Sequence, residues 1–312
     1  MSTVKKYLSL IKFSHTIFAM PFALIGFSLG AFQVWTYGVG IWHFHDGLNP
    51  PDLDWQSATQ PLWLKLLLIL LCMIFARSAA MAFNRYLDRQ FDAKNPRTAI
   101  REIPAGILKA DSVLWFTIIC SLLFVLCTFF INRLCFYLSP VALLVVLGYS
   151  YTKRFTPLCH LILGLGLSLA PIGAYLAVTG RFDLLPILFS LAVICWVSGF
   201  DIIYALQDEE FDKNHQLYSI PSALGKAKAL RVSELLHVLS ALFVIGAGIY
   251  GQFHWLYWIG VAVFVGMLFY QHSIVKPNDL RRVNLAFMTA NGIASVVFAV
   301  FVIADRGFGI AE

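Results

Sequence analysis

The stretch LWLKLLLILLCMIFARSAAMAFNRYLDRQFDAKNPRT, Leu62 to Thr98, changes character part of the way along. Its first 22 residues, to Phe83, are almost entirely apolar. About 20 such residues are enough for a helix to cross the hydrocarbon of a bilayer. The remainder carries an asparagine, two aspartates and several basic residues. A membrane-spanning helix that ends in a charged loop explains this change of character.

The composition excludes most soluble proteins. The chain has 312 residues, of which 59% are hydrophobic and only 13% are charged, and its mean hydropathy is +0.76. A soluble domain of this composition would expose too much apolar surface to water. The net charge of +6 does not indicate a nucleic acid partner, because the basic residues lie in short loops between apolar segments. We therefore expect a polytopic protein of the lipid bilayer that binds no nucleic acid.

Nine apolar segments are long enough to cross the membrane as helices. They lie at about residues 10–37, 61–88, 112–131, 134–150, 158–179, 183–206, 230–250, 252–272 and 283–304. The first is too long for the apolar part of a cleavable signal peptide. We therefore expect an all-α fold, a single transmembrane domain of nine helices over residues 1–312.

Basic residues are divided unequally between the two sides of this expected bundle. The side with the N-terminus carries seventeen, namely Lys5, Lys6, Lys12, Arg89, Lys94, Arg97, Arg101, Lys109, Lys153, Arg154, Lys213, Lys226, Lys228, Arg231, Lys276, Arg281 and Arg282. The other side carries three, namely Arg133, Arg181 and Arg306. Because cytoplasmic loops carry an excess of Lys and Arg, we expect the N-terminus in the cytoplasm and, after nine spans, the C-terminus outside.

The first acidic cluster follows the apolar run directly. Asn84, Asp88 and Asp92 are four residues apart, so on a helix they stack on one face. Two carboxylates in this arrangement repel each other unless a counter-charge is present. Mg²⁺ supplies such a charge, and it typically binds through one or two carboxylates together with substrate phosphates. We expect these three residues to bind Mg²⁺.

A second acidic cluster lies in DIIYALQDEEFD, Asp201 to Asp212. Asp208 and Asp212 are again four residues apart, and Asp201 lies seven residues earlier, roughly on the same helix face. Asp201 is also deeper in its apolar segment, where an acid costs about 2.5–3.5 kcal/mol to insert. Solvated carboxylates at a helix end could explain one such cluster. Two clusters on the same side of the membrane favour a shared metal site.

Basic residues near both clusters complete the expected site. Arg and Lys side chains suit phosphate oxygens, and the candidates are Arg85, Lys94, Arg97, Arg101, Lys153 and Arg154. A diphosphate fits between two carboxylate clusters that bind Mg²⁺. Because the site adjoins a bundle of apolar helices, the rest of the substrate should be a lipid tail. The expected substrate is a polyprenyl diphosphate.

Three motifs resemble those of the UbiA-type intramembrane aromatic prenyltransferases. NRYLDRQFD, Asn84 to Asp92, is similar to their N-x-x-x-D-x-x-x-D motif, and QDEEFD, Gln207 to Asp212, to their second D-x-x-x-D motif. YSYTK, which ends at Lys153, is similar to their Y-x-x-x-K motif. The loops NPRTAIREIPAG and YSIPSALG also resemble this family. The similarity extends over nearly the whole chain.

The resemblance implies nine helices around a central cavity, capped by the loops that follow the two acidic motifs. It also implies Mg²⁺-dependent transfer of a prenyl chain to an aromatic acceptor, in the inner membrane of a bacterium. By position, one Mg²⁺-diphosphate contact falls to Asn84, Asp88 and Asp92, and the other to Asp208 and Asp212. Contacts to the diphosphate fall to Tyr149 and Lys153, and the acceptor side of the cavity to Asp201.

Arg77 is a candidate for binding the acceptor. It lies seven residues before Asn84, on about the same helix face but deeper in the membrane segment. An arginine within the membrane is a functional candidate by default. It could pair with the carboxylate of an aromatic acid, since a guanidinium binds a carboxylate through two parallel hydrogen bonds. An internal ion pair with Asp201 is the alternative.

The acceptor itself stays open between two aromatic acids. One is 4-hydroxybenzoate, in ubiquinone synthesis. The other is a naphthoate-type acid, because ARSAAMAFNRYLDR and SIPSALG resemble a bacterial subgroup linked to the futalosine route to menaquinone. A secondary transporter with ion-coupling acids is the alternative from another class, although such acids tend to lie near the bilayer midplane.

Overall fold

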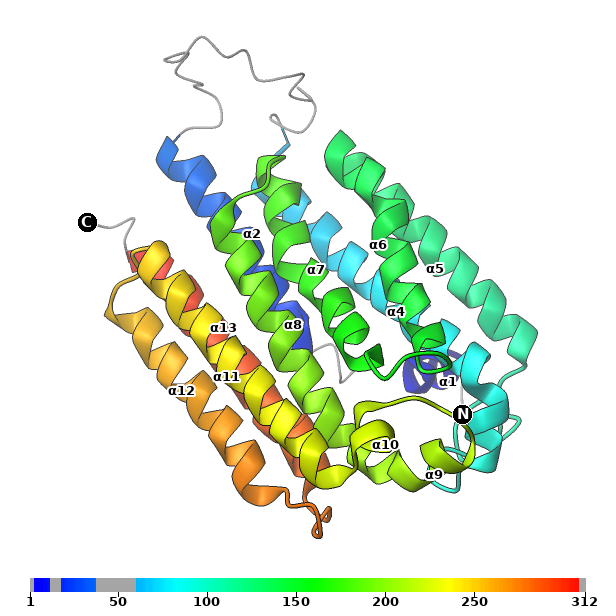
Figure 1. Ribbon diagram of the computed structural model, residues 1–312. Helices are drawn as coiled ribbons and strands as arrows, with labels where there is room; N and C mark the ends of the chain where they lie inside the picture. The colour runs from blue at the N-terminus through cyan, green and yellow to red at the C-terminus, as the bar shows by residue number, and fades with distance from the viewer. Residues whose placement is uncertain (1–2, 12–17, 38–59, 309–312) are drawn as a thin grey trace.

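The computed structural model describes residues 3–11, 18–37 and 60–308 (Figure 1). Within these ranges the chain is almost wholly helical and has no strand, apart from an isolated bridge between Lys276 and Asp279. The helices are α1 (Thr3–Leu10), α2 (Met20–Tyr37), α4 (Leu62–Lys94), α5 (Ala110–Ile131), α6 (Arg133–Thr152), α7 (Cys159–Thr179), α8 (Leu184–Ala205), α9 (Glu209–Asn214), α10 (Ile220–Leu224), α11 (Lys226–Tyr250), α12 (Trp255–Ile274) and α13 (Asn291–Phe308). Short turns of other helical types are η2 (Leu206–Asp208) and η3 (Leu285–Ala290).

Eight helical segments of the described chain are long and apolar enough to cross a membrane. They agree with eight of the nine predicted spans to within a few residues at most ends. The first predicted span, 10–37, is represented by α2, whose apolar part Met20–Val34 is shorter than the other eight. Part of that predicted span, including Lys12, lies outside the described residues. The all-α membrane architecture is therefore confirmed, whereas the count of nine spans stays a prediction.

The long helices run side by side in one bundle (Figure 1). Helix α7 packs on α2, α6 and α8, and so joins the group α4, α5 and α6 to the group α8, α11, α12 and α13. α4 and α8 finish at the same end, where α1, α9 and α10 also lie. We call this the polar end. It comprises the last turns of α4 together with residues 95–109, 153–158 and 206–219.

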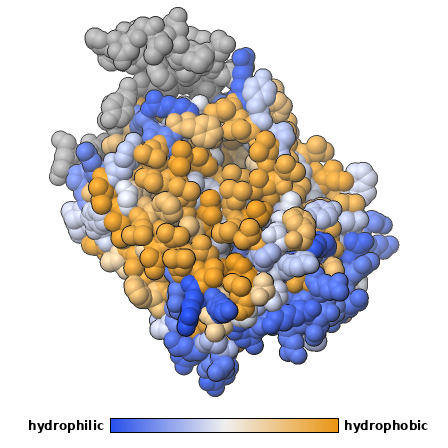
Figure 2. All heavy atoms as spheres, in the orientation of Figure 1, coloured by the Kyte–Doolittle hydropathy of each residue, from blue (hydrophilic) through white to orange (hydrophobic). Residues whose placement is uncertain are grey.

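Aromatic side chains fill the centre of the second group. Trp196 packs against Phe22, Phe200 and Phe264, and Phe298 closes the same cluster. The outward faces are also apolar, as expected for helices surrounded by lipid, and they form the broad orange area in Figure 2. Hydrophilic residues gather at the polar end in the same view. The molecule thus separates an apolar body from one strongly polar end.

Close helix contacts depend on a few glycines. A Cβ added at Gly26 of α2 would lie 2.0 Å from the carbonyl oxygen of Pro171 in α7, and one at Gly164 would lie 2.6 Å from that of Ile194 in α8. Small residues of this kind let helix backbones approach within a membrane. Gly26 therefore fixes how closely α2 approaches α7.

We expect Gly26→Ala to lower the free energy of unfolding by about 1–3 kcal/mol, because the added methyl group forces α2 away from α7. Thermal unfolding of the purified protein in detergent measures this effect. Gly246→Ala on α11 is the matched control, since a Cβ there meets nothing within 4 Å. Equal melting temperatures for the two variants would show that this contact is wrong.

Candidate active site

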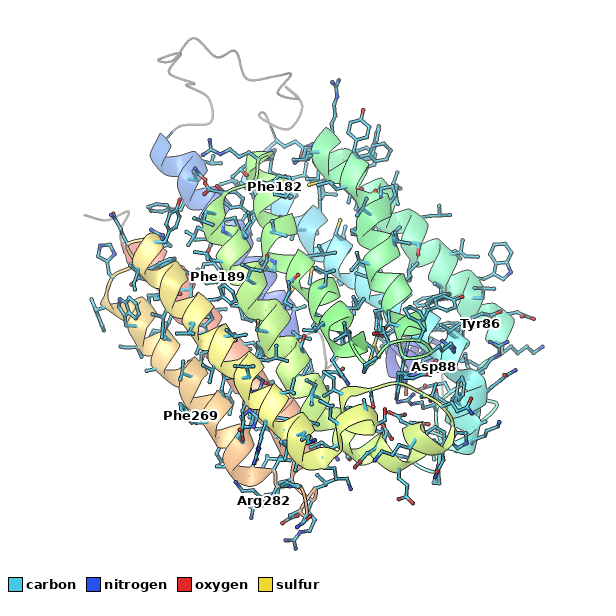
Figure 3. All side chains as sticks on the ribbon, in the orientation of Figure 1. Tyr86, Asp88, Phe182, Phe189, Phe269 and Arg282 are labelled. Carbon is cyan, nitrogen blue, oxygen red and sulfur yellow. The ribbon has the colours of Figure 1, made fainter. Side chains whose placement is uncertain are left out.

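The first acidic cluster lies on α4, which continues as one regular helix to Lys94. The predicted face is therefore present, and the Nδ2 of Asn84 donates a hydrogen bond of 3.0 Å to the Oδ2 of Asp88. Asp92, one turn further on, is 5% exposed. Asp88 lies at the polar end of the bundle, at the opposite end from Phe182 (Figure 3). The helix thus delivers two carboxylates to one place at the edge of the apolar body.

The second cluster lies where α8 breaks. α8 ends at Ala205, and the 3₁₀ turn η2 and the short helix α9 follow it. The chain stays helical from Asp201 to Asp208 but passes through the 3₁₀ turn, so the shared face of these two residues stays a prediction. Asp208 and Asp212 nevertheless stay together at the polar end, and both are buried.

Each carboxylate of the two clusters pairs with one basic side chain. Arg154 Nη2 lies 2.9 Å from Asp88 Oδ1, Arg101 Nη1 lies 2.6 Å from Asp92 Oδ1, Lys153 Nζ lies 2.7 Å from Asp212 Oδ1, and Arg97 pairs with Asp208 through two nitrogens. The cations come from two loops only, 95–109 and 153–158. Four acids and four bases from separate parts of the sequence thus form one cluster of ion pairs.

Arg97 and Asn95 connect the two clusters directly. Both belong to the loop after α4, yet the Nε of Arg97 donates to Asp208 Oδ1 at 3.0 Å and the Nδ2 of Asn95 donates to the same oxygen at 3.1 Å. Arg97 also donates to the hydroxyl of Tyr204 at 2.9 Å and lies over its ring, 5.2 Å from the centroid. The loop after α4 therefore reaches the end of α8.

Lys153 ties the end of α6 to the second cluster. Asp212 has no exposed surface, and its Oδ2 accepts a hydrogen bond of 2.9 Å from Ser219. Burial lowers the pKa of Lys153, but the adjacent Asp212 carboxylate outweighs burial, so the pKa of Lys153 is raised from its ordinary value. The ammonium stays charged at neutral pH, which gives the buried carboxylate the cation it needs.

Two other predicted basic residues behave differently. Arg85 is buried, and its Nε has no hydrogen-bond partner among the described residues. Lys94 is exposed and forms none of the ion pairs found in the described parts of the chain. The structure therefore brings Arg97, Arg101, Lys153 and Arg154 to the acidic clusters but not Lys94.

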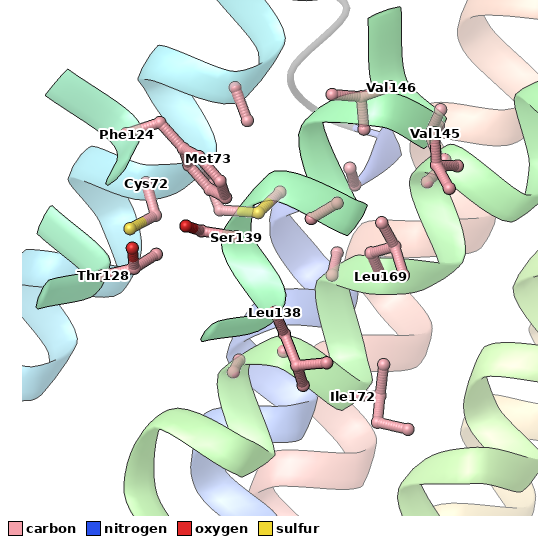
Figure 4. A pocket seen from close by; sticks show the side chains of 18 of the residues that line it. Cys72, Met73, Phe124, Thr128, Leu138, Ser139, Val145, Val146, Leu169 and Ile172 are labelled. Atoms are coloured by element: carbon pink, nitrogen blue, oxygen red, sulfur yellow. The ribbon is translucent and has the colours of Figure 1, made fainter. Parts of the chain in front are cut away.

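An apolar cavity of about 390 Å³ lies between α4, α5, α6 and α7. Its walls are side chains such as Met73, Phe124 and Leu169 (Figure 4), and Figure 2 shows a hollow in the apolar face. Arg77 and Tyr149 line the same cavity. Arg77 is two turns before Asn84 on α4, and Tyr149 is one turn before Lys153 on α6. The cavity therefore extends along these helices toward the acidic clusters.

Arg77 does not pair with Asp201. Its Nε is buried and has no hydrogen-bond partner among the described residues. Asp201 instead pairs with His160, whose Nδ1 lies 2.7 Å from Asp201 Oδ2. The internal ion pair considered from the sequence is thus wrong. The sequence did not indicate His160, because it belongs to no motif and is 41 residues from Asp201 in the chain. It did not indicate Asn95, Tyr204 or Ser219 either.

Comparison with known families gives a match over most of the chain. The family described as the UbiA prenyltransferase family matches residues 55–293. The 4-hydroxybenzoate octaprenyltransferase of Francisella tularensis subsp. novicida is 30% identical over 231 residues, which cover 74% of this chain and 81% of the relative. The enzyme of the same name from Tolumonas auensis is 30% identical over 253 residues, which cover 78% and 86%.

Solved structures with the same fold also exist. The apo structure of a UbiA homologue from Aeropyrum pernix K1 has a TM-score of 0.74 and 25% identity, over 95% of this chain and 98% of the homologue. A UbiA homologue from Archaeoglobus fulgidus, bound to DMAPP and Mg²⁺, has a TM-score of 0.69 and 19% identity, over 97% and 99%. The second likeness concerns the fold alone.

We expect Lys153→Met to lower the free energy of unfolding by about 1–3 kcal/mol, because it leaves the buried Asp212 without its cation. The lower end of that range reflects the lysine side chain, which is 35% exposed. Thermal unfolding in detergent is the measurement. Lys213→Met is the matched control, since Lys213 pairs with Glu209 and is 50% exposed. A loss no larger than that of the control would show that the Lys153 pair does not stabilise the fold.

Proposed function

Because this chain belongs to the UbiA prenyltransferase family, we propose that it transfers a polyprenyl chain from a polyprenyl diphosphate to an aromatic acid with the help of Mg²⁺. The acceptor we propose is 4-hydroxybenzoate, the substrate in the names of the relatives from Francisella and Tolumonas. The product would enter ubiquinone synthesis. Family membership decides for an enzyme over an ion-coupled transporter.

The main support for this proposal is the position of the four ion pairs relative to the apolar cavity. Lys153 and Arg154, next to each other in the loop after α6, pair with Asp212 of α9 and with Asp88 of α4. The cavity lies along α4 and α6, whose ends supply Asp88 and Lys153. A substrate with a diphosphate head and an apolar tail matches this division of polar and apolar surface.

The acidic residues fit Mg²⁺ by their chemistry. Among the described residues no group of three or more His, Cys, Asp and Glu side chains forms a complete metal site. Each cluster offers two carboxylates, and the Oδ2 of Asp92 is buried without a hydrogen-bond partner. Such a donor set suits an ion that takes one or two carboxylates, water and substrate phosphates. Asn84, Asp88 and Asp92 would hold one ion, and Asp208 and Asp212 another.

When bound, Mg²⁺ supplies positive charge for the departing diphosphate. Side chains of the protein would bind the diphosphate and exclude water. Arg97, Arg101, Lys153 and Arg154 would bind phosphate oxygens with charge-assisted hydrogen bonds, and Tyr149 would contact the diphosphate from the cavity. The apolar walls would exclude water from the allylic cation that forms as the C–O bond breaks.

Arg77 is the residue we propose for the carboxylate of the acceptor. It lines the cavity, and its Nε has no hydrogen-bond partner among the described residues. A buried N–H without a hydrogen-bond partner is costly, and an aromatic carboxylate could pair with the guanidinium through two parallel hydrogen bonds. Asp201 would then face the hydroxyl of the acceptor as the group that takes its proton.

A naphthoate-type acid is the second candidate acceptor. The stretches ARSAAMAFNRYLDR and SIPSALG resemble the subgroup of the futalosine route to menaquinone. Both acceptors carry a carboxylate, so Arg77 suits either of them. Their rates in parallel assays distinguish the two.

We also propose an orientation in the membrane. The polar end carries most of the Lys and Arg residues in loops, and such loops face the cytoplasm. The enzyme would thus lie in the inner membrane of a bacterium with its N-terminus in the cytoplasm. With nine spans, its C-terminus would lie outside.

We expect Asp88→Ala to lower the rate of prenyl transfer at least about 100-fold, because it removes a metal ligand and a charge from the diphosphate site. Release of diphosphate by the purified enzyme with Mg²⁺ measures the rate. Asp279→Ala is the control, because Asp279 pairs with the exposed Arg281 in the loop between α12 and η3 and with none of the basic residues of the two clusters. An active Asp88→Ala enzyme would rule out this metal site.

Arg77→Ala should raise the KM for 4-hydroxybenzoate about tenfold or more, since a hydrogen bond to a charged group contributes about 1.5–3 kcal/mol. Steady-state kinetics at saturating polyprenyl diphosphate give this value. 4-Hydroxybenzamide is the control acceptor, because it lacks the charge and its KM should change little. Unchanged KM for 4-hydroxybenzoate would remove Arg77 from the acceptor site.

A further inference from the structure

His160 makes two hydrogen bonds that join separate parts of the site. It lies in the first turn of α7 and is 3% exposed. Its Nδ1 lies 2.7 Å from Asp201 Oδ2 on α8, and its Nε2 lies 3.3 Å from the backbone nitrogen of Ile220. Ile220 is the first residue of α10, in the loop that follows the second cluster. No motif of the sequence includes this histidine.

The two contacts fix which ring nitrogen carries the proton. A backbone N–H can only donate, so the Nε2 of His160 must accept from Ile220 through its lone pair. The proton of the neutral imidazole then lies on Nδ1, where it donates to Asp201. A doubly protonated ring would direct an N–H against the N–H of Ile220. His160 is therefore a neutral donor toward Asp201.

The hydrogen bond from His160 occupies one carboxylate oxygen of Asp201 and leaves the other oxygen available to accept a proton. His160 takes the Oδ2, and the Asp201 side chain is 23% exposed, so the carboxylate is not sealed in the helix packing. Its position is also tied to the second cluster. Ser219 precedes Ile220 and donates to Asp212 Oδ2 at 2.9 Å. A line of contacts thus runs from Asp212 through the loop and His160 to Asp201.

We propose that His160 is a positioning residue that orients Asp201 to remove the phenol proton of the acceptor, and that it holds Asp201 in register with the loop of the second cluster. The inference rests on the proposed function, because it needs an acceptor that carries an aromatic hydroxyl. It adds a residue to that reaction and states which residue acts on which. His160 acts on Asp201, and Asp201 acts on the acceptor.

Prenyl transfer with Asp201 as the base conserves atoms and charge. The phenol proton passes to the Oδ1 of Asp201, while an ortho ring carbon bonds to the allylic carbon and the C–O bond to diphosphate breaks. The resulting ring ketone loses its C–H proton to the diphosphate, and the oxygen regains the proton from Asp201. Asp201 ends as it began, and the products are the prenylated phenol and protonated diphosphate.

The test uses two apolar variants of the full-length enzyme, His160→Met and His160→Phe, of which either suffices. Both remove the two hydrogen bonds and keep most of the side-chain volume. We expect kcat with 4-hydroxybenzoate to fall about tenfold or more. A positioned acid–base group contributes about 100-fold to 10,000-fold to the rate, and a displaced Asp201 should lose part of that contribution. His160→Gln is the conservative control. Its amide can donate to Asp201 and accept from Ile220, so it should keep most of the activity.

A more acidic phenol distinguishes positioning for proton transfer from a structural role. 3-Fluoro-4-hydroxybenzoate ionises more readily and leaves one ortho carbon free, so it depends less on Asp201. The loss in kcat caused by either apolar variant should therefore be smaller, by about threefold, with this acceptor. An equal loss with both acceptors would overturn the proposal, as would full activity of the apolar variants.

The remaining outcomes are also decisive. If neither apolar variant folds while His160→Gln does, as judged by size-exclusion chromatography in detergent, the side chain serves the packing of α10 and the proposal is overturned. If the wild-type enzyme forms no prenylated product, the proposed function itself fails. If the wild type is active, only the role of His160 is at issue.

Discussion

Four carboxylates lie at the end of an apolar bundle, and each of them needs a positive partner close by. A buried charge without a partner costs several kcal/mol, and removing one member of a buried pair leaves that cost behind. The loops of the polar end supply the partners, with Arg97 and Arg101 after α4 and Lys153 and Arg154 after α6. The course of these loops follows from this need for charge balance. The same charges make the polar end suitable for a diphosphate and its metal ions.

The apolar body must face lipid and also enclose a cavity. Its helices face lipid on the outside and enclose a cavity lined by side chains of α4 to α7. Arg77 is the charged side chain among the described residues that line that cavity, and it lies on the helix that carries the first cluster. A single long helix would thus contribute to all three sites that we propose, for the prenyl tail, for the acceptor and for the metal. The distance between them is set by helix geometry, with a rise of about 1.5 Å per residue.

The parts of this arrangement that depend on local sequence could be predicted. Hydropathy placed the long helices, and the four-residue spacing placed Asn84 beside Asp88, since side chains one turn apart share a helix face. The pairing of Arg97 with Asp208 could not be predicted, because it joins two loops that are 111 residues apart in sequence. The contact between His160 and Asp201 could not be predicted either, because it joins two helices at positions 41 residues apart in sequence. The 3₁₀ turn that follows α8 could not be predicted either, because a turn of three residues leaves no mark on hydropathy.

We propose that the acidic clusters and the cavity together serve prenyl transfer to an aromatic acid. Mass spectrometry of products tests it most directly, with the purified protein, a polyprenyl diphosphate and a panel of aromatic acids, with Mg²⁺ or with a chelator. We expect a product with the mass of one acid plus the prenyl group, less one hydrogen of the ring. This product should form only when Mg²⁺ is present. The absence of a prenylated acid across the panel, or equal yields with the chelator, would contradict it.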